Sequence, residues 1–358
     1  MKKILFTAGL LALAANATAQ THVTEYKPGV TESGITYFLP QTRLHITITA
    51  ERVTHTPGEF CQYAERFLRM KNVEKQQRDE WRLLSVEVTP YGVADKSKAY
   101  TIALNPKTSA PLVGLANDGR LLSINTEMPK ISALTAPSVS KVEAPTLNSE
   151  EFKTEEIISA GSTLKMAELT ANEIYDIREN RTLLSKGQAD FMPKDGEQLK
   201  LMLNTLATQE EALLQLFKGT SSKEIHVFTL ELAPEQEMSN HVLFRFSKHL
   251  GLLDADNLAG EPVYLNLKDQ KSLPAEVVVE GKKGKQKEVL DVRYTLPGMA
   301  TLEIFCAERK LASLRLPLAQ FGRVEHLGGD LFNKKYTTKI IFSSETGGIR
   351  KIDAESPK

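Results

Sequence analysis

The chain has few of the residues that most often build metal centres, cofactor sites or nucleophiles. Its 358 residues include two cysteines, seven histidines and one tryptophan. No His-x-His, His-Glu-x-x-His or Cys-x-x-Cys spacing occurs, so a local zinc site has no support. No Gly-x-Ser-x-Gly elbow, phosphate-binding loop or dinucleotide fingerprint is present either. We therefore assign no catalytic, cofactor-binding or metal-binding residue from the sequence.

Net charge and long apolar runs are also lacking. Lys+Arg and Asp+Glu both number 45, so the overall charge does not favour nucleic acid or an anionic membrane as a partner. After residue 20, no run approaches the roughly 18 uncharged apolar residues that a transmembrane helix needs. We expect no nucleic-acid partner and no transmembrane span.

The first 20 residues have the pattern of a secretory signal. Lys2 and Lys3 precede an apolar run over residues 4–15, and Ala17-Thr18-Ala19 is a small-x-small cleavage site. We predict a signal peptide over residues 1–19 and therefore expect the mature protein to be exported. The next residue is not cysteine, so a lipid anchor is not expected at this site.

Cys61 and Cys306 can form a disulfide in an oxidising compartment. The bond would close a long loop and contribute about 4–5 kcal/mol through chain entropy. Both cysteines also fall on apolar faces of their segments, which favours the alternative of two buried free thiols. The sequence leaves both possibilities open.

Residues 163–219 carry the clearest local signals and predict a central antiparallel helical hairpin. Thr170 begins a capping box at the start of the first helix, and Gly187 ends that helix. Asp195 begins a second capping box, and Gly219 ends the second helix.

The hairpin also supplies the candidate partner contacts. Leu199, Leu206 and Leu213 recur every seven residues, so one seam of the second helix faces a partner helix. Arg178 and Arg181 lie three residues apart on one face of the first helix. We name Arg178, Arg181, Leu206 and Leu213 as candidate contacts. The alternatives are that the hairpin braces the neighbouring sheets and that the arginines form a solvated face.

Strand patterns dominate the rest of the chain. Strict alternation in Leu44–Ala50 and a strand-like run in Trp81–Val88 indicate a small N-terminal α+β domain over residues 20–128. Residues 129–162 read as a linker or surface loop. Short strands recur from 220 to 358, as in a β-sandwich. The predicted fold class is α+β and β-dominated, with the hairpin between the two blocks.

Two groups of residues carry a resemblance to a known family. The first group is Ala171–Arg181, Pro193–Glu197 and Leu216–Gly219, and the second is Gln320–Gly322, Leu331–Lys335 and Glu345–Ile349. Together they resemble a family of exported proteins of Bacteroidetes-type bacteria that is classed as a domain of unknown function. The resemblance implies the cell envelope of a Gram-negative bacterium, and it implies that the hairpin and the C-terminal sandwich belong to one unit. It implies no activity and no catalytic residue.

We expect a non-enzymatic binding or assembly module of the cell envelope, which acts through protein surfaces on another envelope protein and needs no cofactor. The alternative is an envelope hydrolase that acts on glycan or peptide with carboxylates from the sandwich loops, because two carboxylates are enough for such chemistry. A carbohydrate-binding sandwich is least favoured, since the single tryptophan, Trp81, lies in the first block.

Overall fold

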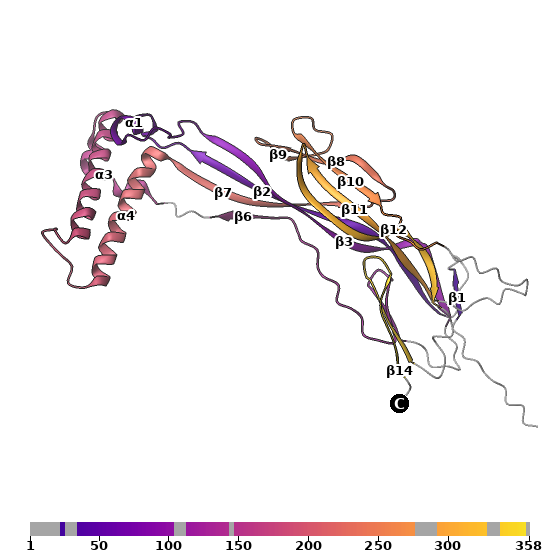
Figure 1. The fold of residues 1–358 in the computed structure, drawn as a ribbon. Coiled ribbons are helices and arrows are strands. Elements are labelled where there is room, and N and C mark those ends of the chain that lie inside the picture. The colour runs from indigo at the N-terminus through magenta and orange to yellow at the C-terminus, as the bar shows by residue number, and fades with distance from the viewer. Residues whose placement is uncertain are drawn as a thin grey trace, which may run out of the picture.

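The computed structural model describes residues 22–25, 34–103, 112–142, 147–275, 292–327 and 337–355. The molecule is long, with helices at one end and three sheets of antiparallel strands along the rest (Figure 1). The predicted signal peptide lies outside the described residues. Within the described residues, no helix is long and apolar enough to cross a membrane. Strands predominate over helices, as predicted.

Two long strands form the backbone of the first sheet. β2 (Gly34–Thr56) and β3 (Arg78–Ala103) pair along nearly their whole length. β7 (Thr220–Leu232) pairs with the other edge of β2, and β6 (Ser138–Val142) pairs with β7. β1 (His22–Glu25) pairs with β3, so the strand order is β1-β3-β2-β7-β6. The run predicted as a strand, Trp81–Val88, is part of the much longer strand β3.

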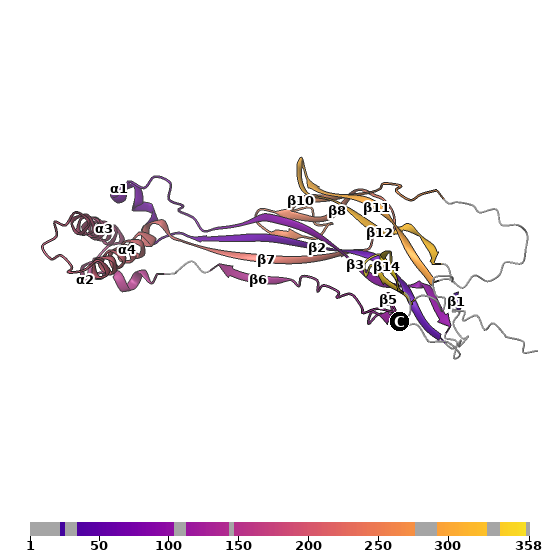
Figure 2. The same ribbon diagram turned by 60° about the horizontal axis from the view of Figure 1, so that its bottom comes forward.

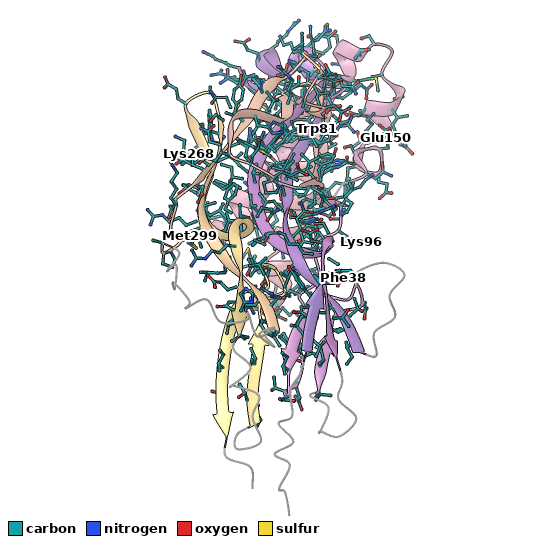
Figure 3. All side chains as sticks on the ribbon, turned by 90° about the vertical axis from the view of Figure 1, so that its right-hand side faces the viewer. Phe38, Trp81, Lys96, Glu150, Lys268 and Met299 are labelled. Atoms are coloured by element: carbon teal, nitrogen blue, oxygen red, sulfur yellow. The ribbon has the colours of Figure 1, made fainter. Side chains whose placement is uncertain are left out.

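The second sheet has the order β12-β11-β10-β8-β9. Its strands are β8 (Met238–Ser247), β9 (Gly251–Leu253), β10 (Glu261–Asp269), β11 (Val292–Cys306) and β12 (Arg309–Leu327). Figure 3 shows Lys268 and Met299 of this sheet on one side of the molecule and Phe38 and Lys96 of the first sheet on the other. The two sheets therefore form a sandwich.

The sandwich core follows from strand periodicity. Alternate side chains of a strand point to the same face, and Leu44, Ile46 and Ile48 of β2 are fully buried in one cluster. Leu265 of β10 and Leu302 of β11 belong to the same cluster and are also fully buried. Burying each such side chain contributes about 1.5–3 kcal/mol, so this cluster holds the two sheets together.

A third sheet lies at the end of the molecule away from the helices (Figure 1). Its order is β14-β13-β5-β4, with bounds Ile349–Glu355, Thr337–Phe342, Leu121–Ile124 and Val113–Leu115. Its buried side chains form a cluster with Tyr37 and Leu39 of β2 and with Val292 and Leu327 of the second sheet. All three sheets therefore meet in this region.

The predicted division into an N-terminal domain and a C-terminal sandwich is not confirmed. Two sheets join strands from both predicted domains. In the first sheet β2 pairs with β7, and in the third sheet β5 pairs with β13. The predicted linker contains β6, the 3-10 helix η2 (Ser149–Phe152) and α2 (Glu155–Ser159). Alternation identifies the faces of a strand but not its neighbours, which is why the sequence did not indicate this mixing.

The predicted hairpin, formed by α3 (Thr163–Lys186) and α4 (Gly196–Lys218), is present, but it lies at one end of the molecule rather than between two β blocks (Figure 1). Two short helices, η1 (Cys61–Tyr63) and α1 (Ala64–Leu68), lie beside the hairpin. In the sequence they form the connection from β2 to β3. α4 runs into β7 through Gly219, so the hairpin is a direct extension of the first sheet (Figure 2).

Three of the four predicted helix ends are confirmed. Asp195 Oδ1 accepts from the Gln198 amide at 2.7 Å, Gly187 adopts φ +70° after α3, and Gly219 follows α4. The predicted start at Thr170 is wrong, because α3 is capped by Ser162. Thr170 lies inside the helix, where its hydroxyl donates to the Met166 carbonyl at 2.8 Å. A threonine can satisfy its hydroxyl in this way within a helix, so it need not be a cap.

Candidate functional site

The base of the hairpin is packed against the η1–α1 connection between β2 and β3. Phe60 beside η1 and Phe217 of α4 are both fully buried, with ring centroids 5.5 Å apart. The Phe60 amide donates to the Leu216 carbonyl at 2.7 Å. The apolar cluster around these residues includes Ala171 and Ile174 of α3. The base of the hairpin therefore packs on the η1–α1 segment that joins β2 to β3.

Arg178 and Arg181 link the two helices. Arg178 Nε and Arg181 Nη1 each donate to a different carboxylate oxygen of Glu210 on α4, both at 2.7 Å. The Glu210 side chain is only 10% exposed. Charge-assisted bonds to a buried carboxylate are stronger than neutral ones, so both arginines hold the hairpin together. Both arginines remain partly exposed, at 38% and 42%, so their face of the helix is solvated as well as paired with Glu210.

The leucine seam changes along the hairpin. Leu213 is 1% exposed and belongs to the core at the base, whereas Leu206 is only partly buried. Leu199, one heptad further out, is also partly buried. From Gly196 to Gln209, no residue of α4 is buried. The seam is therefore covered at the base and left open at the outer end.

A cavity of about 570 Å³ lies between α3, α4 and their connecting loop at the outer end. We call it the hairpin groove. Its apolar lining includes Leu183, Phe191, Leu201, Met202 and Leu206. Phe191 is 66% and Leu201 67% exposed. Asp190 is the one charged residue among those that line the groove in the described structure. Exposed apolar surface of this kind commonly marks an interaction site.

Cys61 and Cys306 are both free thiols in the structure. Cys61 begins η1 at the helical end, whereas Cys306 ends β11, where its thiol donates to Glu261 Oε2 at 3.8 Å. The two thiols are unpaired in this structure, and of the two only Cys61 is buried, whereas Cys306 is partly exposed. Burial, together with the charge of Glu261, raises the pKa of the Cys306 thiol. A raised pKa lowers thiolate reactivity.

A second cavity, of about 790 Å³, lies where the three sheets meet. We call it the three-sheet cleft. It is lined by Thr89–Gly92 of β3, by parts of β11 and β12, and by the loop between β13 and β14. Residues 131–134 of an extended segment between β5 and β6 form a further wall. We call this segment, residues 127–137, the strap.

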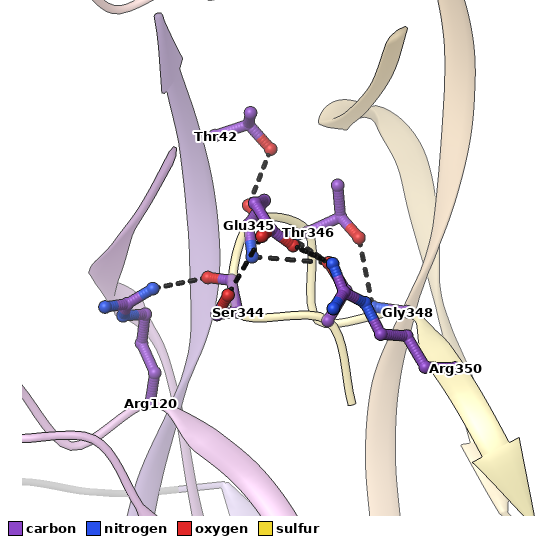
Figure 4. Close-up of polar contacts among 8 residues, drawn as sticks. Thr42, Arg120, Ser344, Glu345, Thr346, Gly348 and Arg350 are labelled. Carbon is purple, nitrogen blue, oxygen red and sulfur yellow. Dashed lines mark hydrogen bonds and ion pairs between the residues drawn. The ribbon is translucent and has the colours of Figure 1, made fainter. Parts of the chain in front are cut away.

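The loop between β13 and β14 is organised around Glu345 (Figure 4). Its carboxylate accepts from the Ser343 and Ser344 hydroxyls and from Arg350 Nη2, the last at 2.9 Å. Burial favours a raised pKa for Glu345, but the Ser343 and backbone hydrogen bonds, with the charge of Arg350, outweigh it and hold the pKa below its usual value. The carboxylate is therefore ionised at neutral pH.

Arg120 and Thr42 fasten this loop to the rest of the molecule. Arg120 is buried, donates through Nε to Asp118 at 2.7 Å and donates through Nη1 to the Ser344 carbonyl. Thr42 of β2 donates to the Glu345 carbonyl at 2.9 Å and accepts from the Ala319 amide at 3.0 Å. Each charged residue that lines the cleft thus has an internal partner.

The cleft does not contain the paired acids that a glycosidase uses. Glu345 is the one carboxylate among the lining residues in the described structure. No group of three metal-ligating side chains was found within the described residues. Sequence reasoning did not select Arg120 or Glu345 as site residues. The local signals were the Glu345–Ile349 stretch, quoted for the family resemblance, and its Gly347-Gly348 turn.

Comparison with known proteins identifies a family but no matching curated protein or solved structure. A family model described as "Domain of unknown function (DUF4831)" matches residues 33–350 of the chain. Comparison with curated proteins gave no match, and comparison with solved structures gave none either.

Proposed function

Because the chain belongs to the DUF4831 family, a domain of unknown function, we propose a function from its geometry: it is a non-enzymatic binding or assembly module whose hairpin groove takes an amphipathic helix of another envelope protein. The observation that carries this proposal is the open outer half of α4, where no residue between Gly196 and Gln209 is buried. The pattern of residues 1–19 supports export to the envelope.

The shape and chemistry of the hairpin groove favour a helix as the occupant. α3 and α4 are 24 and 23 residues long, but their shared core lies mainly at the base. The outer halves leave apolar side chains from both helices facing an unfilled space. Amphipathic helices bind such grooves through apolar residues spaced at helical intervals. Asp190 alone supplies charge to the lining, so the occupying face is apolar.

Photo-crosslinking tests this proposal in the native envelope. A photoreactive phenylalanine analogue at position 201 should give one discrete adduct with another protein. An adduct with the mass of two copies of this chain would contradict the proposed partner. The same analogue at position 207, an exposed residue of α4 outside the groove, is the matched control. Adducts of equal yield from both positions, or no adduct from position 201, would refute the groove as a docking site.

A second pair of variants asks whether the contact matters for association. Leu201→Glu places a charge in the groove, and we expect it to weaken association at least tenfold, because an unpaired charge in an apolar contact is costly. Ala207→Glu adds the same charge on an exposed position and should have no effect. Both variants should fold, since neither side chain is buried.

The hydrolase alternative is less well supported. It needs two carboxylates about 5–9.5 Å apart around a substrate. Glu345 is the one carboxylate of the cleft lining and is engaged by Arg350. We therefore favour the binding module.

A further inference from the structure

The three-sheet cleft has the size of a small-molecule site and no place in the proposed protein contact. Its volume of about 790 Å³ falls within the roughly 300–1,000 Å³ of typical ligand pockets. It lies beside the strap, where the three sheets meet. Sites between packed elements that are apolar with a few fixed polar groups are where small ligands bind.

The walls of the cleft are largely apolar rings and aliphatic side chains. Pro90, Pro297 and Pro317 line it together with Tyr91 and Tyr294. Burial raises the pKa of both tyrosines, so each phenol is neutral at physiological pH. Flat, rigid and uncharged walls make favourable contact with an apolar ligand and lose little side-chain entropy when they do so.

The charges in the cleft cancel within the protein. Arg120 pairs with Asp118 at 2.7 Å, and Arg350 pairs with Glu345 at 2.9 Å. A charged ligand would have to leave water without an unpaired opposite charge to receive it, which is unfavourable. The cleft is therefore selective against ions and suited to an uncharged molecule.

The strap gives a ligand access to this space. Of residues 127–137, all except Pro129 and Leu134 are exposed, so the strap is only lightly packed on the body. His45 of β2 donates from Nε2 to the Thr135 carbonyl at 2.9 Å, which anchors the strap beside the cleft. A segment with few buried contacts can open locally at low free-energy cost.

We propose that the three-sheet cleft binds an uncharged, largely apolar small molecule between the strap and the sandwich. The proposal is independent of the hairpin contact, because none of the cleft residues lines the hairpin groove.

Two fluorescent probes that share one ring system and differ in charge test the proposal on the mature full-length protein. N-phenyl-1-naphthylamine is uncharged, and 1-anilinonaphthalene-8-sulfonate carries a sulfonate. We expect the uncharged probe to bind with one site per chain and at least about tenfold more tightly than the anionic probe. Equal or tighter binding of the anionic probe would overturn the selectivity for uncharged ligands.

Tryptophan variants on the strap locate the bound probe. Ala133 lines the cleft and is exposed, so Ala133→Trp can fill the space without altering a buried core. Ala136→Trp is the control, because Ala136 is equally exposed on the strap but does not line the cleft. Ala133→Trp should weaken binding of the uncharged probe at least about tenfold, and Ala136→Trp should leave it unchanged.

Two further variants separate the possible outcomes. Pro317→Trp fills the cleft from β12 instead of the strap and should weaken binding even if the Ala133→Trp side chain turns out to solvent. Leu201→Glu alters the hairpin groove alone. If Leu201→Glu abolishes probe binding while both cleft variants bind normally, the probe occupies the hairpin and the cleft proposal fails.

Discussion

Single polar side chains in this protein act mainly by joining elements that are distant in sequence. Glu210 connects two arginines of the neighbouring helix, and Thr42 connects the β13–β14 loop to both other sheets. Both side chains are buried and cannot bond to water, so their hydrogen bonds to protein groups satisfy them instead. Replacing such a residue leaves its partners unsatisfied, which costs more than the bond itself contributes.

Glu345 gives a residue-scale prediction about acid stability. We expect Glu345→Gln to lower the free energy of unfolding at pH 7 by about 1–3 kcal/mol, because hydrogen bonds to a charged acceptor are lost. The Glu345 pKa is lowered in the folded state, so the carboxylate stabilises the fold above its ordinary pKa of 4.5. This contribution disappears as the pH falls through the lowered pKa.

The difference between wild type and Glu345→Gln should therefore shrink as the pH falls below about 4.5 in urea-unfolding titrations. Glu308→Gln, at an exposed position, is the control and should stay within about 0.5 kcal/mol of wild type at every pH. A difference that grows on acidification would contradict the assigned role of Glu345.

At the scale of elements, the junction between α4 and β7 depends on one glycine. Gly219 has φ +78°, and a Cβ added there would lie 2.2 Å from the Thr56 carbonyl oxygen. Gly219→Ala should destabilise the protein by roughly 2 kcal/mol or more, since both the backbone conformation and the close approach require glycine.

Gly196 is the matched control for this prediction. It is also a glycine at an end of α4, but a Cβ there would meet no atom within 4 Å. Gly196→Ala should be neutral or stabilise by up to about 1 kcal/mol, because alanine is the better helix former. Thermal unfolding of the two variants checks the contrast, and equal losses would show that the junction is not constrained as described.

The elements also show which features the sequence could predict. Helix ends depend on residues within one turn, so Gly187, Asp195 and Gly219 were identified from local pattern. Thr170 fits the same pattern but bonds back to Met166 instead. The seven-residue seam was visible, but the burial of Leu213 and the opening at Leu206 depend on the contacts of η1 and α1 at the base.

The three-sheet cleft could not be predicted in the same way. The cleft is lined by segments from different parts of the chain, which meet only because distant strands pair. These segments include Thr89–Gly92, Arg120, residues 131–134 and the loop that contains Glu345. Alternation in Leu44–Ala50 correctly indicated a strand, but nothing local specifies β7 as its neighbour. The sequence therefore predicts elements more reliably than it predicts sites formed between them.

At the scale of the whole molecule, the first sheet connects the helical hairpin to the sandwich. β2, β3 and β7 extend from the sandwich toward the helical end, so α3 and α4 lie far from β14 of the third sheet (Figures 1 and 2). The chain enters and leaves the helical end through these paired strands. A projecting hairpin with a rigid base and an open outer half suits contact with a partner at a distance from the sandwich.

Pairing across the chain predicts that the two halves fold only together. Leu44, Ile46 and Ile48 of β2 are fully buried, and their cover includes Leu265 and Leu302 from the C-terminal half. We therefore expect a fragment of residues 20–142 and a fragment of residues 147–358 each to lack a dispersed amide NMR spectrum. Each would expose the apolar face that the other half covers.

Co-expression of the two fragments provides the decisive comparison. β2 belongs to the first fragment and β7 to the second, and the two strands pair along Leu44–Thr56 of β2. The fragments should therefore associate and recover a cooperative thermal transition close to that of the intact protein. A fragment of residues 147–358 that unfolds cooperatively alone would instead support the independent C-terminal sandwich predicted from the sequence. In that case the hairpin would be an attachment of the second half, and its position relative to β2 and β3 would not depend on the shared sheet.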